Sequence, residues 1–371
     1  MKKNTSKIVG LITLLGVGSL AVGLLTPLAI GQIKDSHAQT VAAAKELVAE
    51  IEQEAKKEGM LNSVGMPDTK LNWGETWADL GQMHSLTHLD TNLHSGEVLT
   101  QFQIDGENAT ADIGDVGLSF GALAASKELT LPYKTTYWDE IPNWAKDDDG
   151  DWLLSYTGTM AFITDKENVQ DVPKTWGALA KGDYCVSVGD VTTSNQAQYA
   201  VLAAAMANGG DETVSRLGIE YFKRIAAQDR LSTVDPSLEN LAAGKIDVAI
   251  IWDFNALNYR EQIDKDRFEV CIPKEGSVTS GYTTVINKYA QHPNAAKLAR
   301  EYILSDEGQI NLAKSYARPI REIALPAEVK AKLLPDEQYE AVEPVNDQVA
   351  WNETALELPE IWETEVLGQT P

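Results

Sequence analysis

Chemistry-bearing side chains gather directly after the most apolar stretch of the chain. The run 246–251 is continuously apolar and predicts a strand that is buried on both faces. Trp252, Asp253 and Asn255 follow it, and residues just past the carboxyl end of such a strand face the crevice of an α/β sheet. An aromatic face beside a carboxylate suits a cationic ligand. The alternative is that Trp252 fills the core and Asp253 caps a helix that begins near Ala256.

Small polar residues stand before two predicted helices. Thr193 and Ser194 open a polar stretch that leads into the Ala-rich helix predicted over 196–207, and one cap needs only one such residue. A binding loop at a helix N-terminus therefore suits this stretch. Ser95 starts another predicted helix that runs to about Ile104. There, capping alone is the alternative to ligand contact.

The first predicted strand of the body, 60–64, leads into a turn that holds Asp68 and Thr69. These two side chains are candidates for ligand contact, although a Pro-Asp turn also forms hydrogen bonds with itself. Trp73 follows, and either stacks on a ligand or anchors its own helix.

Four further positions complete the candidate binding site. Asp115 and Gly117 follow a short predicted strand, where glycine permits close approach of a ligand to the backbone or serves only a tight turn. Thr157 lies between two predicted strands, 152–156 and 160–164, as a hinge or a ligand contact. The remaining candidates are Tyr282 and Arg318, and the guanidinium of Arg318 suits either a ligand anion or a carboxylate of the fold.

The sequence gives no positive sign of a metal centre or of catalysis. His84 and His88 are four residues apart, but the segment that holds His88 reads as a strand, so the two rings would not share a helical face. The chain contains no Gly-x-Ser-x-Gly, His-Glu-x-x-His or phosphate-loop motif. We therefore expect no metal, no cofactor and no catalytic residue.

Length and charge narrow the class of protein. The 371 residues suit two domains, and 31 basic against 55 acidic residues give a net charge of −24. A field of this sign repels phosphate backbones, so nucleic acid is excluded as a partner. Cys185 and Cys271 both fall in predicted strands, and either a disulfide bond or two buried thiols is open.

The first residues predict export. Three lysines precede the uncharged stretch 8–30, and Ser36-His37-Ala38 has the small-x-small pattern of a cleavage site. Residues 1–38 are thus either a signal peptide cleaved near Ala38 or an uncleaved N-terminal anchor. In both cases the body lies outside the cytoplasm, in the periplasm or at the outer face of the membrane.

The body alternates between strand and helix signals. Helical spacing over 41–58 is followed by strands and helices in turn, and the tail is mainly helical over 293–317 and past Pro326. Such alternation predicts βα units and an α/β fold with mostly parallel sheets. Because no linker separates two domains, we expect the chain to cross between lobes more than once.

Several segments, in this order and spacing, resemble the extracellular solute-binding proteins of ABC importers, the branch with polyamine, iron(III), thiamine and phosphonate binders. They are Gly65-Met66-Pro67-Asp68-Thr69, Ala111-Asp112-Ile113-Gly114-Asp115-Val116-Gly117, Tyr156-Thr157-Gly158-Thr159-Met160-Ala161-Phe162, Val172-Pro173-Lys174-Thr175-Trp176 and the stretch from His292 to Pro319. The resemblance implies a two-lobed fold of the periplasmic-binding-protein type, with helix-flanked sheets joined by crossing hinge strands. It assigns 39–157 to lobe 1, 158–279 to lobe 2, and 280–371 to a return to lobe 1 with a helical C-terminal region.

The resemblance also implies a function and partners. A small polar ligand is held between the lobes and delivered to the permease subunits of an ABC importer by a monomeric, non-catalytic protein. Iron(III) binders of this branch use adjacent tyrosines, and this chain has no Tyr-Tyr pair. The carboxylates Asp68, Asp115 and Asp253 with Trp73 and Trp252 favour a polyamine or other cationic amine. Helix N-termini with Ser95, Ser194 and Ser280, together with Arg318, favour a phosphonate or sugar phosphate. We lean towards the amine. An exported enzyme or a sensor on the same scaffold is the further alternative.

Overall fold

The computed structural model describes residues 45–213 and 215–369. The described residues fall into two units that divide between Ala49 and Glu50. In the first unit the described residues, 45–49, are helical. The predicted signal or anchor, 1–38, lies outside the described residues. No helix in the described ranges is both long enough and apolar enough to span a bilayer. The remaining description concerns the second unit.

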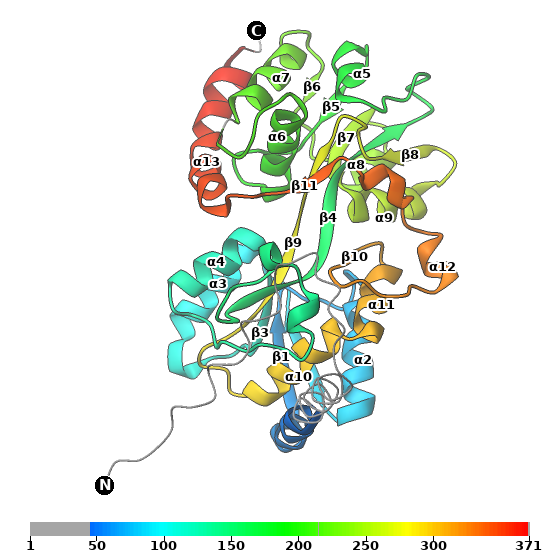
Figure 1. Ribbon diagram of the computed structural model, residues 1–371. Helices are drawn as coiled ribbons and strands as arrows, with labels where there is room; N and C mark the ends of the chain where they lie inside the picture. Colours follow the sequence, from blue (N-terminus) through cyan, green and yellow to red (C-terminus); the bar gives the residue numbers. More distant parts are fainter. Residues whose placement is uncertain (1–44, 214, 370–371) are drawn as a thin grey trace, which may run out of the picture. The chain divides into compact units, whose positions relative to one another are not determined.

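A single mixed sheet runs through the second unit in the strand order β2-β1-β3-β9-β4-β7-β5-β6, with β8 and β10 on β4 and β11 on β9 (Figure 1). The strands are β1 Met60–Val64, β2 Thr87–Thr91, β3 Ile113–Gly117, β4 Trp152–Asp165, β5 Val186–Ser187, β6 Leu231–Ser232, β7 Val248–Trp252, β8 Phe268–Cys271, β9 Ser277–Ile286, β10 Arg318–Pro319 and β11 Val342–Pro344. The predicted α/β fold is confirmed.

Two long strands, β4 and β9, join the two halves of this sheet. β1, β2 and β3 pair in parallel at one end, and β5, β6 and β7 do so at the other. Every antiparallel pairing involves β4 or β9. The parallel strands therefore define two lobes, and β4 and β9 are the crossing strands between them.

β4 is one strand where the sequence pattern predicted two. The interruption at Gly158 reflects packing and does not end the strand: a Cβ there would lie 2.4 Å from the ring of Phe254. Glycine at this position lets the ring pack against a continuous crossing strand. The turn-forming appearance of Gly158 in the sequence therefore arises from a tertiary contact.

Helices flank each lobe (Figure 1). Those of the first lobe pack on β1–β3 or on one another, and those of the second lobe lie around β5–β8. Before the second lobe, the chain forms α2 Trp73–His84, α3 Ser95–Asp105 and α4 Leu118–Ser126. The helices of the second lobe are α5 Trp176–Lys181, α6 Asn195–Ala207, α7 Arg216–Ala226, α8 Leu238–Ala242 and α9 Asp253–Ile263. After the second lobe come α10 Pro293–Leu304, α11 Asp306–Lys314 and α12 Ala327–Lys330.

The C-terminal segment leaves the first lobe again. β11 pairs in parallel with the second-lobe end of β9. α13 (Gln348–Ile361) follows, and its Trp351 packs edge-on against Tyr199 of α6, while Trp362 in the π-helix Trp362–Val366 packs against Phe222 of α7. The sequence analysis placed 280–371 in lobe 1. That assignment is corrected past β11, because these apolar contacts lie on the second lobe.

The two cysteines are free thiols. Cys271 is buried in β8, and burial raises the pKa of its thiol to about 11. Cys185 is exposed and precedes β5. The structure therefore contains two free thiols and no disulfide bond between Cys185 and Cys271. Only one of the two predicted buried thiols, that of Cys271, is buried.

Candidate functional site

A cavity of about 950 Å³ lies between the lobes. Its walls come mainly from the carboxyl ends of strands and the first turns of the helices that follow them, as α/β sheets place binding residues. Nine of the fourteen candidate residues line this cavity: Thr69, Trp73, Ser95, Asp115, Thr193, Ser194, Trp252, Asn255 and Tyr282. The structure thus brings together residues that are up to 213 positions apart in the chain.

Five candidates lie outside the cavity lining: Asp68, Gly117, Thr157, Asp253 and Arg318. Asp68 is exposed, and its backbone carbonyl accepts the N–H of Gly74 at 3.4 Å, as a self-contained turn would. Gly117 donates its backbone N–H to Ser95 Oγ at 3.1 Å. These two positions support the cavity wall, since each neighbours a residue that lines it.

Thr157 and Arg318 belong to the crossing region. They pair with each other where β10 meets β4. The Arg318 guanidinium lies 3.8 Å from the ring centroid of Tyr339 and forms an ion pair with Asp336. Arg318 therefore pairs with a carboxylate of the fold, which is one of the two roles predicted for it.

Asp253 is buried with its hydrogen bonds filled. One carboxylate oxygen accepts the backbone N–H groups of Thr159 and Phe254, both at 2.9 Å, and the other accepts the hydroxyl of Tyr339. Burial raises the pKa of this carboxyl, and the hydroxyl bond opposes that rise. The first residue of α9 thus ties α9 to both β4 and the segment before β11.

Aromatic rings form a continuous part of the cavity wall. Tyr156 stacks on Tyr282 with 5.5 Å between ring centroids, and it meets Trp73 and Phe254 edge-on at 6.3 and 6.0 Å. Phe254 stacks in turn on Trp252 at 6.4 Å. All five line the cavity and come from both lobes and both crossing strands. This part of the cavity wall is therefore mainly apolar.

Three buried polar atoms of this wall lack a hydrogen-bond partner: Nε1 of Trp73, Nε1 of Trp252 and Oδ1 of Asp115. Trp73 is fully buried, Trp252 is 2% exposed and Asp115 is 6% exposed. The indole N–H of Trp252 lies near the Tyr282 hydroxyl but outside hydrogen-bond geometry. A buried polar group without a partner costs about 1–3 kcal/mol, and a ligand in the cavity can supply the partners of these three atoms.

Two helix N-termini open into the cavity. Ser95, Gly96 and Glu97 of α3 line it, and so do Ser194, Asn195 and Gln196 at the start of α6. The first backbone N–H groups of a helix have no intrahelical acceptor and carry partial positive charge.

Each helix start also has a fixed cap. Ser194 Oγ accepts the N–H of Ala197 at 3.3 Å, and the Glu97 carboxylate accepts the N–H of His94 at 2.8 Å. The caps leave N–H groups of the first turns free for an anion.

Gln196 is a cavity residue that was absent from the candidate set. Its Oε1 accepts the backbone N–H of Trp252 at 3.1 Å and the side-chain amide of Asn255 at 3.0 Å. It thereby fixes the start of α9 against the start of α6.

Other cavity residues were also missed, among them Lys70, Leu71, His94, Asn195, Tyr156, Phe254 and Phe120. Most of these residues lie next to a candidate residue in the sequence, and this proximity is the sequence signal that could have identified them. Tyr156 shows the limit of that signal. Side chains alternate along a strand, so Tyr156 faces the cavity while Thr157 does not.

Charged groups of the cavity are few. Lys70 donates from Nζ to Asn92 Oδ1 at 3.3 Å and forms no ion pair with the described residues. Asp115 accepts the Tyr156 hydroxyl at 2.8 Å on Oδ2. Burial raises the pKa of Asp115 well above its usual range, and the nearby carboxylate of Asp90 adds to that rise. Apart from Lys70, His94, Glu97 and Asp115, the polar residues of the lining are uncharged.

His84 and His88 contact different partners. His84 approaches Glu52 at 3.3 Å, while the ring of His88 stacks on Trp77 at 4.1 Å. Within residues 45–213 and 215–369, no three His, Cys, Asp or Glu side chains are arranged to hold a metal ion.

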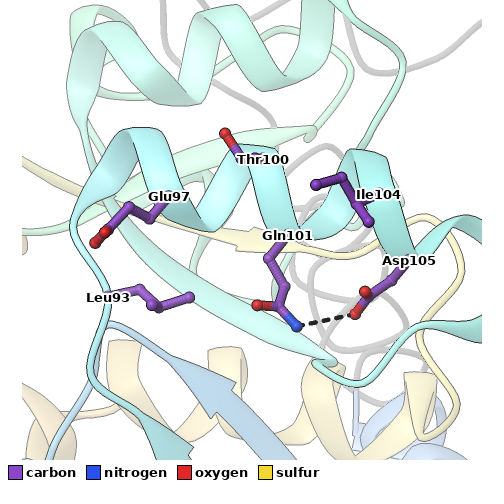
Figure 2. Close-up of a pocket in the computed structure, with 6 residues that line it drawn as sticks. All are labelled: Leu93, Glu97, Thr100, Gln101, Ile104 and Asp105. Carbon is purple, nitrogen blue, oxygen red and sulfur yellow. Dashed lines mark hydrogen bonds between the residues drawn. The ribbon is translucent and has the colours of Figure 1, made fainter.

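A smaller pocket of about 270 Å³ lies alongside α3 and shares Leu93, Glu97 and Thr100 with the main cavity (Figure 2). None of its lining residues is fully buried. Gln101 donates to Asp105 at 3.0 Å, as the dashed line in Figure 2 shows. The polar side chains here are satisfied by one another or by solvent, so this pocket is not the candidate site.

Two lobes that share crossing strands, with a polar-and-aromatic cavity between them, define a ligand-binding fold. Residues 108–344 match the family described as bacterial extracellular solute-binding protein, and the chain belongs to this family.

The curated relatives include two sulfate-binding proteins. The one from Salmonella typhimurium (strain LT2) is 26% identical over 223 residues, which cover 58% of this chain and 66% of that protein. The one from Escherichia coli (strain K12) is 27% identical over 173 residues, or 44% of this chain and 52% of that protein. The matched region thus spans about half to two thirds of these relatives.

Solved structures agree in fold. The periplasmic binding protein AfuA from Actinobacillus pleuropneumoniae, with fructose-6-phosphate bound, has a TM-score of 0.68 at 18% identity, covering 83% of this chain and 98% of that chain. Iron-bound HitA from Pseudomonas aeruginosa has a TM-score of 0.64 at 16% identity, covering 81% and 98%. At this identity the likeness extends to the fold.

Proposed function

We propose that this protein is the exported, non-catalytic solute-binding component of an ABC importer, and that its cavity captures an anionic solute through neutral hydrogen-bond donors. In this account it acts as a monomer and delivers the solute to the permease subunits. Residues 1–38 direct export. Family membership and the cavity between the lobes support the role, and the chemistry of the cavity supports the class of ligand.

The observation that carries the proposal is the set of unfilled donors. Trp73 Nε1 at the start of α2 and Trp252 Nε1 at the end of β7 are buried without acceptors in residues that line the cavity. The first turns of α3 and α6 add backbone N–H groups, and Lys70 adds a cation. Groups of these kinds donate hydrogen bonds to an oxyanion, and hydrogen bonds to a charged group are worth about 1.5–3 kcal/mol each.

The anion replaces our leaning towards a polyamine, which remains unconfirmed. A cationic amine needs ionised carboxylates, and the cavity holds only Asp115 and Glu97. Burial favours the neutral form of Asp115, and the Glu97 carboxylate already accepts the N–H of His94. Asp68 and Asp253, which were to complete an amine site, lie outside the lining. The aromatic wall alone gives a cation no counter-charge.

Relatives support an anion as well. Three are named sulfate-binding proteins, and a solved structure of the same fold holds fructose-6-phosphate. Those names describe other proteins, but both ligands present oxyanions. Hydrogen-bond donors such as those that line this cavity bind an oxyanion.

Calorimetric titration and thermal unfolding test the proposal. We expect one or more of sulfate, thiosulfate, inorganic phosphate and fructose 6-phosphate to bind the mature protein with one site per chain. A saturating anion at 100 times its dissociation constant stabilises the fold by about 2.7 kcal/mol. Binding of spermidine with no binding of any of these anions would contradict the anionic ligand.

A further inference from the structure

The sheet of the first lobe ends in a strand that is paired on one side. β2 stands at the end of the strand order and, in the part of the chain that the structure describes, pairs only with β1. The backbone N–H of Thr87 points to that side and donates to the Gly59 carbonyl at 3.0 Å. Backbone groups of successive strand residues point to alternate sides, so those of His88 and Asp90 point away from β1. They offer N–H and C=O groups to a further strand.

One face of β2 is exposed and uncharged. Its row consists of Thr87, Leu89 and Thr91, and Leu89 is 60% exposed. Leu93 follows the strand and lines the small pocket beside α3 together with Ile104, which is 78% exposed (Figure 2). Edge strands of natural proteins commonly carry a lysine, a proline or a bulge that prevents pairing, and this row has none of them. The edge of β2 is therefore open to a partner.

The titratable side chains of β2 lie on its other face. His88 Nε2 and Asp90 Oδ1 each form a hydrogen bond with Ser63 Oγ, at 2.9 and 2.5 Å. The ring of His88 also stacks on Trp77 of α2. Because both side chains contact their own lobe, the outward backbone groups of these two residues stay uncovered by them.

The strand is nearly symmetric in sequence about Leu89. β2 reads Thr-His-Leu-Asp-Thr, so antiparallel pairing of two copies centred on Leu89 pairs all five residues. Each Thr87 then lies opposite a Thr91, and each His88 opposite an Asp90. The outward N–H and C=O groups of His88 and Asp90 form hydrogen bonds with each other, and the two Leu89 side chains meet where opposite side chains are closest.

Other registers are worse. Only registers that differ by two residues keep the outward backbone groups facing each other. A shift by two in either direction leaves part of each strand unpaired and places two His88 or two Asp90 residues opposite one another. Like charges directly opposite are destabilising. The register centred on Leu89 is therefore favoured by both backbone and charge.

We propose that the outer edge of β2 docks a second copy of this chain, through antiparallel pairing of β2 with itself in the register centred on Leu89. This inference goes beyond the proposed function: one chain captures and delivers the solute, and the pair is an additional form. Interfaces below about 1,200 Å² are weak and transient, so a contact built on one short strand from each chain forms at high protein concentration.

Sedimentation equilibrium of the mature protein over a wide range of concentrations tests the docking. It is done in about 0.15 M salt, which screens the repulsion between two chains of net charge −24. We expect the average mass to rise towards that of two chains. Leu89→Lys should raise the dissociation constant of the pair at least about tenfold, because the register brings two lysines together. Leu356→Lys makes the same change at an exposed leucine of α13 and should keep the pair.

Cysteine cross-linking tests the register. In a Cys185→Ser background, Leu89→Cys should form a disulfide between chains on oxidation with copper phenanthroline, because the Cα atoms of this opposite pair are about 4.5 Å apart. Thr87→Cys is the matched variant. The two Thr87 residues lie at opposite ends of the paired strands, roughly 13 Å apart, which is too far for a disulfide. Equal cross-linking of both variants would overturn the register and with it the inference.

The sedimentation results decide in the same way. A mass that stays that of one chain at every concentration would overturn the inference and leave the edge to a different partner. A pair that Leu89→Lys does not weaken would also overturn it, since another surface would then hold the chains together. These experiments use no ligand, so their failure leaves the proposed function standing.

Discussion

Two buried aspartates, Asp115 and Asp253, look alike in the sequence and differ in the structure. Each stands near the end of a buried strand, and burial raises the pKa of both. Asp253 accepts three donors, two of them backbone N–H groups, and lies outside the cavity lining. Asp115 accepts one donor and lines the cavity.

The two aspartates differ in how many of their hydrogen bonds the fold itself supplies. A buried carboxylate that the fold satisfies completely stabilises the fold, as Asp253 does between α9, β4 and the segment before β11. A buried carboxylate left with a free oxygen indicates a missing partner. Both aspartates lie near the end of a strand. The number of hydrogen bonds that the fold supplies to each carboxyl therefore distinguishes the structural Asp253 from the cavity residue Asp115.

The largest expected effect concerns Asp253. Replacing Asp253 by Ala leaves the N–H groups of Thr159 and Phe254 and the hydroxyl of Tyr339 without an acceptor, and each buried loss costs about 1–3 kcal/mol. We expect the free energy of unfolding in urea to fall by about 3 kcal/mol. Asp115→Ala is the matched variant and should cost less than half as much. A larger loss for Asp115→Ala would reverse the comparison.

The next effect concerns two tryptophans with opposite hydrogen-bond states. Trp252 Nε1 has no partner, whereas Trp176 Nε1 donates to the Gly276 carbonyl at 3.0 Å away from the cavity. Trp252→Phe should weaken anion binding about tenfold to a hundredfold, as loss of a hydrogen bond to a charged group does. Trp176→Phe should lower the unfolding free energy by about 1 kcal/mol and leave the affinity unchanged. Titration calorimetry and urea unfolding of both variants check the contrast.

A smaller effect concerns pH. The folded-state pKa of Asp115 is raised above its unfolded value of about 3.9. Its contribution to stability is therefore fully present below that value and is lost as the pH rises towards the folded pKa. Asp115→Asn removes this loss. The stability of the variant relative to wild type should thus increase between pH 5 and pH 8, measured by urea unfolding without ligand. A constant difference across that range would contradict the raised pKa.

Sequence alone indicated much of the fold. Small polar residues at Ser95 and Ser194 predicted the starts of α3 and α6 to within one or two residues, and the apolar run before Trp252 predicted β7. These signals depend only on residues close together in the sequence, so they can be recognised without the tertiary structure. The path of β4 through Gly158 and the return of α13 to the second lobe depend on contacts between distant residues, which no local pattern encodes.

The candidate site was predictable to the level of segments and not of side chains. Segments at the ends of strands were chosen correctly as cavity walls at 193–196 and 252–255. Within a segment, the choice between Tyr156 and Thr157 depends on which face of β4 meets the cavity, and the choice between Trp252 and Asp253 depends on which polar atoms the fold already satisfies. Both depend on three-dimensional packing.

We expect a ligand anion to accept hydrogen bonds from the unpartnered indole N–H groups of the cavity. Heteronuclear NMR of the protein labelled with nitrogen-15 at its nine tryptophans observes those groups directly. Assignment follows from the variants Trp73→Phe, Trp252→Phe and Trp176→Phe. On titration with an anion that calorimetry shows to bind, the Nε1–H signals of Trp73 and Trp252 should move downfield while that of Trp176 stays in place. Saturating binding that leaves the signals of Trp73 and Trp252 unmoved would contradict the account.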